Sequence, residues 1–281
     1  MTPLTLPADW PHRAASRRIA CRPHLWHVQE MGAGPLVLLL HGAGGATHSW
    51  RHLMPLLVGF RAVAVDLPGQ GFTRMGSRRR CGVDAMAEDI AALCAAEGWV
   101  PAAVIGHSAG GAIALRLAEV LPVPKVVGIN AALGSFDGAA GWLFPLMARV
   151  LAATPMVPEL FSRLSGTPER VAALLASTGS RVDAAGAAQY LALIRSPGHV
   201  DATLAMMAQW KLDGLLARFP AMTAQVLLIT GARDPTVPPG VSERAAGRIP
   251  GAEWVNLPGL GHLAQEEAAD VVAGVVLAFL A

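Results

Sequence analysis

Short apolar runs alternate with longer segments of helical periodicity along most of the chain. Six runs are typical of strands, at 36–40, 61–65, 102–105, 125–130, 226–230 and 253–257. Helix-like segments lie near 50–57, at 84–97, at 110–121, around 242–249 and after Gln265. Continuous apolar strands separated by helices indicate a mostly parallel sheet with helices on both faces. The predicted class is therefore α/β, with residues 18–30 as a leading antiparallel hairpin.

One long region interrupts this alternation, because residues 134–215 contain no convincing strand. The pattern there predicts four helices, near 142–151, at 167–177, at 183–195 and at 200–215. Helices inserted at this point would cover the carboxyl edge of the sheet, where open α/β sheets bind their ligands. We therefore expect an α/β core of residues 1–133 and 216–281, and a helical cap of residues 134–215.

The composition narrows the class of protein further. Of the 281 residues, 53% are hydrophobic, and the formal charge of +2 argues against a nucleic-acid partner. The three cysteines lack metal-ligand spacing and favour a reducing compartment without a zinc site. The N-terminus lacks the apolar segment of a secretory signal. We expect a cytoplasmic protein, in which the apolar stretch 141–161, interrupted by prolines, forms a lid or a surface for peripheral membrane contact.

The segment "VIGHSAGGAIAL" holds the first candidate catalytic residue. Ser108 stands between glycines in a G-x-S-x-G pattern, after a strand-like run and before a helix-like one. In this context the pattern is typical of a nucleophile elbow, a sharp turn that lifts a serine hydroxyl clear of the sheet. The start of the following helix would favour negative charge that develops there.

A serine needs a base to accept its proton and a carboxylate to orient that base. Asp234 follows the strand-like run in "QVLLITGARDPTVP", and His262 follows the run in "WVNLPGLGHL". Both would lie at the carboxyl edge of the sheet with Ser108. Asp137 is the alternative acid, because some hydrolases take their carboxylate from the preceding strand. We predict a triad of Ser108, Asp234 and His262.

An oxyanion hole requires two N–H donors that are fixed before the reaction. The amide of Ala109, directly after the serine, is one candidate. The second would come from "HGAGG" after the first parallel strand, where Ala43 is preferred over Gly44. Gly44 and His107 are also candidates for the edge of a substrate pocket, although His107 within its glycine motif is more typical of loop support.

Taken together, "HGAGG", "DLPGQGFT", "GHSAGG", "GARDPTVP" and "GLGH" resemble the motifs of the α/β-hydrolase fold in the same order. The resemblance covers nearly the whole chain. It implies a central sheet with a helical cap inserted before the acid-bearing strand. Haloalkane dehalogenases and epoxide hydrolases of this fold use an aspartate nucleophile, and the serine at position 108 disfavours both activities.

A narrower resemblance lies outside these motifs. "LPADWPHRAASRR", "NAALGSFDG", "STGSRVDAAGAAQY" and "RSPGHVDATLAMMAQW" are similar to the magnesium-chelatase accessory proteins of bacteriochlorophyll biosynthesis. This resemblance implies a role near magnesium insertion into protoporphyrin IX, contact with magnesium chelatase subunits, and a location in the cytoplasm at the edge of the photosynthetic membrane. Because no P-loop or metal-ligand set is present, we expect no cofactor and no metal.

Two functions remain open at this stage. The protein hydrolyses an ester, thioester or related acyl bond of a small molecule, such as a tetrapyrrole or its ester, or it binds a porphyrin or the chelatase and retains the triad without using it. Trp142, Met206 and Trp210 could form an apolar roof over a flat substrate. Ordinary core packing between helices is the alternative for these side chains. His199 is a weaker candidate for an axial ligand.

Overall fold

The computed structural model describes residues 5–134, 154 and 156–281, and its centre is an eight-stranded sheet in the order β1-β2-β4-β3-β5-β6-β7-β8. The strands are β1 (Ser16–Cys21), β2 (His24–Gly32), β3 (Leu36–Leu40), β4 (Arg61–Val65), β5 (Pro101–His107), β6 (Lys125–Ile129), β7 (Gln225–Gly231) and β8 (Glu253–Leu257). The β1–β2 hairpin is antiparallel and β2 joins β4 antiparallel, whereas the six strands β3 to β8 are mutually parallel. The predicted mostly parallel sheet is confirmed.

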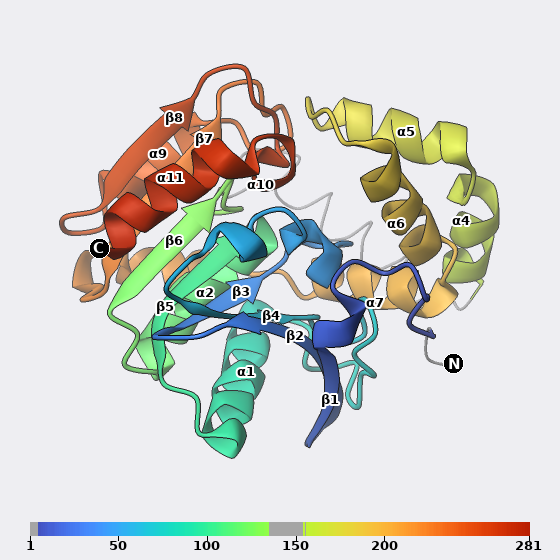
Figure 1. Cartoon of the computed structure of the whole chain (residues 1–281), viewed down its shortest axis with the longest axis horizontal. Coiled ribbons are helices and arrows are strands. Elements are labelled where there is room, and N and C mark those ends of the chain that lie inside the picture. The colour runs from blue at the N-terminus through green and yellow to red at the C-terminus, as the bar shows by residue number, and fades with distance from the viewer. Residues whose placement is uncertain (1–4, 135–153, 155) are drawn as a thin grey trace.

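Helices cover both faces of this sheet (Figure 1). Side chains of α1 (Val83–Glu97), α2 (Ala109–Val120) and α9 (Gly240–Ala246) form the core of one face, and α11 (Ala269–Leu280) covers the other. Alternate residues of β3 serve the two cores, because successive side chains of a strand point to opposite faces. Leu38 packs with the α1–α2 side, while Val37 and Leu39 pack with the α11 side.

Five helices lie between β6 and β7 in the described chain, and we call them the inserted helices. They are α4 (Val157–Ser165), α5 (Pro168–Ser177), α6 (Ala184–Ile194), α7 (Pro197–Ala208) and α8 (Asp213–Arg218). Figure 1 shows α4, α5 and α6 grouped beyond one end of the sheet, on the far side from α11. The domain boundaries at 133/134 and 215/216 stay a prediction.

Local structure differs from the sequence prediction in three places. The helix expected near 50–57 is two short 3-10 helices, Thr47–Trp50 and Met54–Leu56, because Pro55 removes a backbone donor. The helix expected at 200–215 is divided into α7 and α8. Helix α4 was not predicted, and the helix expected near 142–151 lies outside the described residues.

Candidate active site

Ser108 occupies a strained turn between β5 and α2. Its φ of 50° and ψ of −116° are unusual for a side-chain-bearing residue. A Cβ at Gly106 would lie 2.1 Å from the Gly110 carbonyl oxygen, so the close crossing of strand and helix requires glycine. The Ser108 amide donates to the Ile129 carbonyl at 2.9 Å, and its carbonyl accepts from Gly111 and Ala132. These main-chain bonds stabilise the strained conformation and place the side chain at the N-terminus of α2.

The carboxylate of Asp234 is buried beyond the end of β7 and is fully hydrogen-bonded. One oxygen accepts from the amides of Thr236 and Val237 at 2.7 and 3.0 Å. The other oxygen accepts from Asn130 Nδ2 at 2.7 Å and from His262 Nδ1 at 2.7 Å. Four donors hold the carboxylate in one orientation. The acid and the base predicted from sequence are therefore in direct contact.

The imidazole of His262 is oriented from several sides. Because Nδ1 donates to Asp234, Nε2 carries the lone pair that a general base needs. The His262 amide donates to the Thr178 carbonyl at 3.0 Å, and its carbonyl accepts from His107 Nε2 at 2.8 Å. The rings of His107 and His262 lie 4.9 Å apart.

His107 also relates the position of Ser108 to that of Asp234 and His262. A Cβ built on Gly42 would lie 2.8 Å from His107 Nδ1 and 3.0 Å from Ser108 Cβ, so Gly42 touches both residues. Ser108 therefore directly follows, in the chain, the residue whose imidazole contacts His262. Among the described residues, Ser108 Oγ makes no hydrogen bond. The hydroxyl is therefore free to meet a substrate and the base.

Two backbone amides remain available at this edge of the sheet. Ala109 begins α2, so its N–H has no acceptor within the helix. In the "HGAGG" loop the Gly44 amide donates to Gln70 Oε1 at 2.7 Å and the Gly45 amide donates to the Gly42 carbonyl. Within the described chain, the amide of Ala43 makes no hydrogen bond. Of the two alternatives, the geometry favours Ala43 as the second donor.

Residues 178–180, between helices α5 and α6, lie between the loops that carry Asp234 and His262. The Thr178 carbonyl accepts from His262, and Ser180 Oγ accepts from the Leu263 amide at 2.8 Å. A Cβ on Gly179 would lie 2.4 Å from the Arg233 carbonyl oxygen, and one on Gly261 would lie 2.5 Å from the Gly179 carbonyl oxygen. Residues 178–180 therefore fill the space between the Asp234 and His262 loops.

A buried ionic cluster lies on the other side of the histidine loop. The Glu266 carboxylate, whose side chain is fully buried, pairs with Arg51 and accepts from Ser49 at 2.9 Å and from Tyr190 at 2.7 Å. Arg51 also donates to Asp183 at 3.0 Å. We call these residues the Arg51–Glu266 cluster. It connects the segment after the "HGAGG" loop, the segment after His262, and helix α6.

The residues predicted to line a substrate pocket have different positions. Met206 is 1% exposed and packs in the main core, in agreement with the alternative of core packing, and its pocket role stays a prediction. Trp210 packs against the same core, as the alternative stated, and its pocket role stays a prediction. His107 is also buried and hydrogen-bonds the His262 carbonyl, and its pocket role stays a prediction. Trp142 and Asp137 lie outside the described residues.

Several residues near the site were not predicted from sequence. Asn130, at the end of β6, has a φ of 46° and donates to Asp234. A polar residue at the end of a parallel strand is the signal that could have identified it. His199 was a candidate axial ligand, but both of its ring nitrogens are hydrogen-bonded to backbone groups, of Gly71 and Gly44. Within the described residues no group of three His, Cys, Asp or Glu side chains could hold a metal ion.

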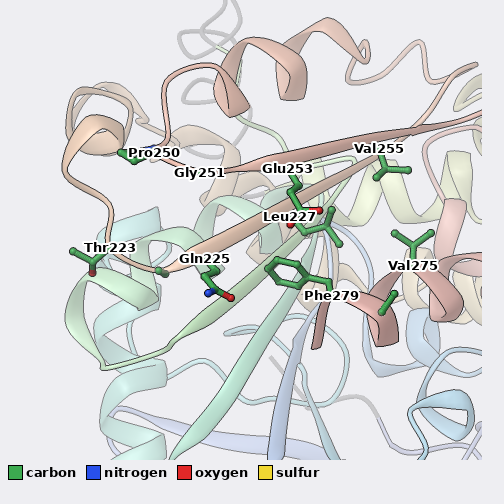
Figure 2. A pocket seen from close by; sticks show the side chains of 11 residues that line it. Thr223, Gln225, Leu227, Pro250, Gly251, Glu253, Val255, Val275 and Phe279 are labelled. Carbon is green, nitrogen blue, oxygen red and sulfur yellow. The ribbon is translucent and has the colours of Figure 1, made fainter. Parts of the chain in front are cut away.

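A surface groove lies away from these residues. It has a volume of about 640 Å³ and includes Gln225 and Glu253, the first residues of β7 and β8. Figure 2 shows Leu227 and Phe279 lining this groove. It is therefore at the amino edge of the sheet, opposite the Asp234 and His262 loops, and it is not the site of the candidate chemistry. In the described chain no helix is long and apolar enough to cross a membrane.

Buried neutral histidines predict a loss of stability in mild acid. Burial lowers the pKa of His48 and His107 well below the usual value, with Arg51 and His262 adding to the shift, and lowers the pKa of His199 to about 4. Between these values and the unfolded value of about 6.5, the unfolded chain binds more protons, so stability falls as the pH falls. Each histidine that stays neutral in the folded protein lowers the free energy of unfolding at pH 5 by about 2 kcal/mol, relative to neutral pH.

Urea unfolding at pH 7.5 and 5.0 measures this loss. Burial raises the pKa of Glu266 and opposes the effect, so a single histidine must be isolated. His48 has no hydrogen-bond partner on either ring nitrogen among the described residues. The His48→Gln variant should therefore lose about 2 kcal/mol less than the wild type between the two pH values. An equal loss of stability in His48→Gln and the wild type would contradict the conclusion that His48 stays neutral in the folded protein.

Comparisons with known proteins agree with this architecture. Residues 35–269 match the family profile described as the alpha/beta hydrolase fold. The chain is 49% identical to the magnesium-chelatase 30 kDa subunit of Rhodobacter capsulatus, over 100% of this chain and 99% of the relative. It is 29% identical to a pimeloyl-[acyl-carrier protein] methyl ester esterase of Xanthomonas campestris, over 91% of this chain and 98% of the relative.

Solved structures show the same fold. An alpha/beta hydrolase fold protein from Burkholderia ambifaria matches with a TM-score of 0.78 at 22% identity, over 94% of this chain and 97% of that one. An esterase from Thermogutta terrifontis matches with a TM-score of 0.74 at 22% identity, over the same shares. The chain therefore belongs to the α/β-hydrolase fold family and, within it, to the family of the magnesium-chelatase 30 kDa subunit.

Proposed function

We propose that this protein is a serine hydrolase that cleaves an ester, thioester or related acyl bond in or near the magnesium-insertion step of bacteriochlorophyll biosynthesis. The observation that carries the proposal is the 2.7 Å contact between His262 Nδ1 and Asp234 Oδ2, next to a strained turn that presents Ser108. A metal-insertion factor has no need of an oriented imidazole beside a serine with no bonded partner in the described chain.

Each residue has a defined part in this mechanism. His262 Nε2 removes the proton from Ser108 Oγ as the oxygen attacks the carbonyl carbon. Asp234 holds the imidazole and stabilises its protonated form. The amides of Ala43 and Ala109 donate to the oxyanion of the tetrahedral intermediate. His262 then returns the proton to the leaving group, and water attacks the acyl-enzyme by the same route.

The substrate class is proposed from the relatives. A relative with 49% identity is named as a magnesium-chelatase subunit, which favours a substrate of the tetrapyrrole pathway, such as a tetrapyrrole or its ester. The Xanthomonas relative is named as a methyl ester esterase, which is the bond type that this geometry would cleave. We propose that the inserted helices form a cap over the site and that the substrate enters between cap and core.

A fluorophosphonate probe tests the proposal, because it reacts with a serine only when the hydroxyl is activated. We expect a phosphonyl adduct on the peptide that contains Ser108, identified by mass spectrometry. The Asp234→Asn variant should label about 10⁴-fold more slowly, because the imidazole then adopts the wrong tautomer. The Asn256→Asp variant, at the neighbouring strand, is the control and should label at the wild-type rate. Rapid labelling of Asp234→Asn would contradict the triad.

A binding role is the second candidate, and an exposed apolar surface favours it. Met156, Leu160 and Leu164, at the start of and along α4, are 77%, 56% and 51% exposed, whereas Pro158 and Ser162 of the same helix are buried. Apolar side chains on the solvent side are typical of a contact surface. Magnesium chelatase subunits or the photosynthetic membrane are the proposed partners. Rescue of pigment synthesis by the Ser108→Ala variant would distinguish this role from hydrolysis, because binding does not need the Ser108 hydroxyl.

A further inference from the structure

Both peptide groups of Gly44 are held by side chains. The Gly44 amide donates to Gln70 Oε1 at 2.7 Å, and the Gly44 carbonyl accepts from His199 Nε2 at 3.1 Å. Gly44 has a φ of +76°, a conformation that glycine adopts without strain. Its neighbour in the chain is Ala43, the candidate oxyanion donor. The direction of the Ala43 amide therefore depends on how these two side chains hold the loop.

The hydrogen bonds of His199 define its protonation. The Gly71 amide donates to Nδ1 at 3.0 Å, so Nδ1 carries a lone pair and the single ring proton is on Nε2. The ring is 3% exposed, and burial lowers its pKa to about 4. At neutral pH it is therefore an uncharged bridge, which accepts from the loop after β4 and donates to the loop after β3.

We propose that His199 is a positioning residue for the oxyanion hole: through its bond to the Gly44 carbonyl, it fixes the backbone that directs the Ala43 amide toward the reacting oxygen. This inference rests on the proposed hydrolase function. His199 belongs to α7, so one of the inserted helices contributes to the geometry of the site in addition to covering it.

The bond to Gly44 matters because an oxyanion donor acts only when it is already in place. Removing one such donor costs about 10²–10³ in kcat, and a displacement of about 1 Å can cost 10²-fold. Gln70 holds only the amide side of Gly44, and its own amide nitrogen contacts Met206 Sδ at 3.2 Å. Without His199 the Gly44 carbonyl, which belongs to the next peptide group, has no fixed partner among the described residues.

Two amide substitutions separate the two bonds of the imidazole. In His199→Gln the longer side chain reaches the position of Nε2 and can donate to Gly44. In His199→Asn the shorter side chain replaces Nδ1, so it can accept from Gly71 but cannot reach Gly44. With p-nitrophenyl acetate as substrate, we expect kcat to fall about 10- to 100-fold in His199→Asn with little change in KM. His199→Gln should recover most of the loss.

His24 offers a matched control. It is also buried, accepts from the Gly76 amide at 3.2 Å and donates to Asp89 at 3.0 Å, but it lies in β2 against α1. His24→Asn should lower the melting temperature without lowering kcat per folded molecule. Equal kcat in His199→Asn and His24→Asn would overturn the proposal, and so would equal losses in His199→Asn and His199→Gln.

Amide hydrogen exchange gives a readout that does not need turnover. His199→Asn should accelerate exchange at Gly44 and Gly45 by about tenfold or more, whereas His24→Asn should not. If the wild-type protein neither labels nor hydrolyses the ester, the proposed function fails, and exchange still decides whether His199 holds the loop. Unchanged exchange in His199→Asn would refute the positioning role.

Discussion

Replacement of Ser108 by alanine is expected to lower hydrolysis of an activated ester by about 10⁴- to 10⁶-fold and to abolish fluorophosphonate labelling. The nucleophilic oxygen is lost, while the turn that carries it is held by main-chain bonds to Ile129, Gly111 and Ala132. Because these bonds do not involve the hydroxyl, the melting temperature should stay within a few degrees of the wild type. Initial rates and mass spectrometry of the probe-treated protein measure the two losses.

Ser242 provides the control for this experiment. It is a fully buried serine in α9, on a different element from the site, and its hydroxyl has no partner among the described residues. Ser242→Ala should retain full activity. Strong labelling of Ser108→Ala would contradict the assignment of the nucleophile.

The Ser108→Ala variant also distinguishes the two candidate functions, hydrolysis and binding, in the cell. Wild type and Ser108→Ala would be expressed in a phototrophic bacterium that lacks the corresponding gene, and bacteriochlorophyll would be measured. A hydrolase predicts that only the wild type restores the pigment. Equal rescue would show that the pathway needs the protein as a binding partner, even if the purified enzyme hydrolyses esters.

Replacement of Arg51 by methionine is expected to destabilise the protein by about 3–5 kcal/mol at pH 8, because it leaves the Glu266 carboxylate buried without its cation. Burial already raises the pKa of Glu266, and the loss of Arg51 would raise this pKa further. The folded variant then binds a proton that the unfolded chain releases, so the difference from wild type should shrink as the pH falls to 5. Urea unfolding of Arg51→Met and the wild type at pH 8 and pH 5 measures this difference in stability.

Two further variants show whether the charge or the packing is responsible. In Arg51→Met/Glu266→Leu both charges are absent, and most of the lost stability should return, since paired replacement of buried ions by apolar groups is often neutral. Arg17, which is 40% exposed and pairs with Glu30 and Glu97, is the surface control. Its methionine variant should lose less than about 1 kcal/mol. An equally small loss in Arg51→Met would refute the role of the cluster.

The parts of the structure that follow from local pattern were predictable. The strands 36–40 and 61–65 were predicted with the bounds that the structure has, because each is an apolar run buried on both faces, after the half-buried Arg61 in the second. The predicted bounds of a helix were wrong where a single residue interrupts the helical pattern, as Pro55 does. Asp234 and His262 were found because each follows a strand at the same edge of the sheet.

Contacts between distant segments could not be predicted in this way. His199 is 155 positions from Gly44, and Glu266 is 215 positions from Arg51. Neither residue has a local signal, since each is one polar residue in a helix-like run. Their importance comes from the three-dimensional arrangement of α7, α10 (Ala264–Glu267) and the loops after β3 and β4. Supporting residues of this kind need coordinates, whereas the candidate reacting groups are visible as motifs.

The tripeptide at 178–180 limits how this fold could be re-engineered. Exchanging the inserted helices for those of another α/β-hydrolase-fold protein would ordinarily be a way to alter selectivity. Here such a graft would remove the main-chain acceptor for His262 and the hydroxyl acceptor for Leu263. A chimera would therefore have to keep Thr178, Gly179 and Ser180 from the parent, with both glycine contacts intact, for the His262 imidazole to remain aligned with Asp234.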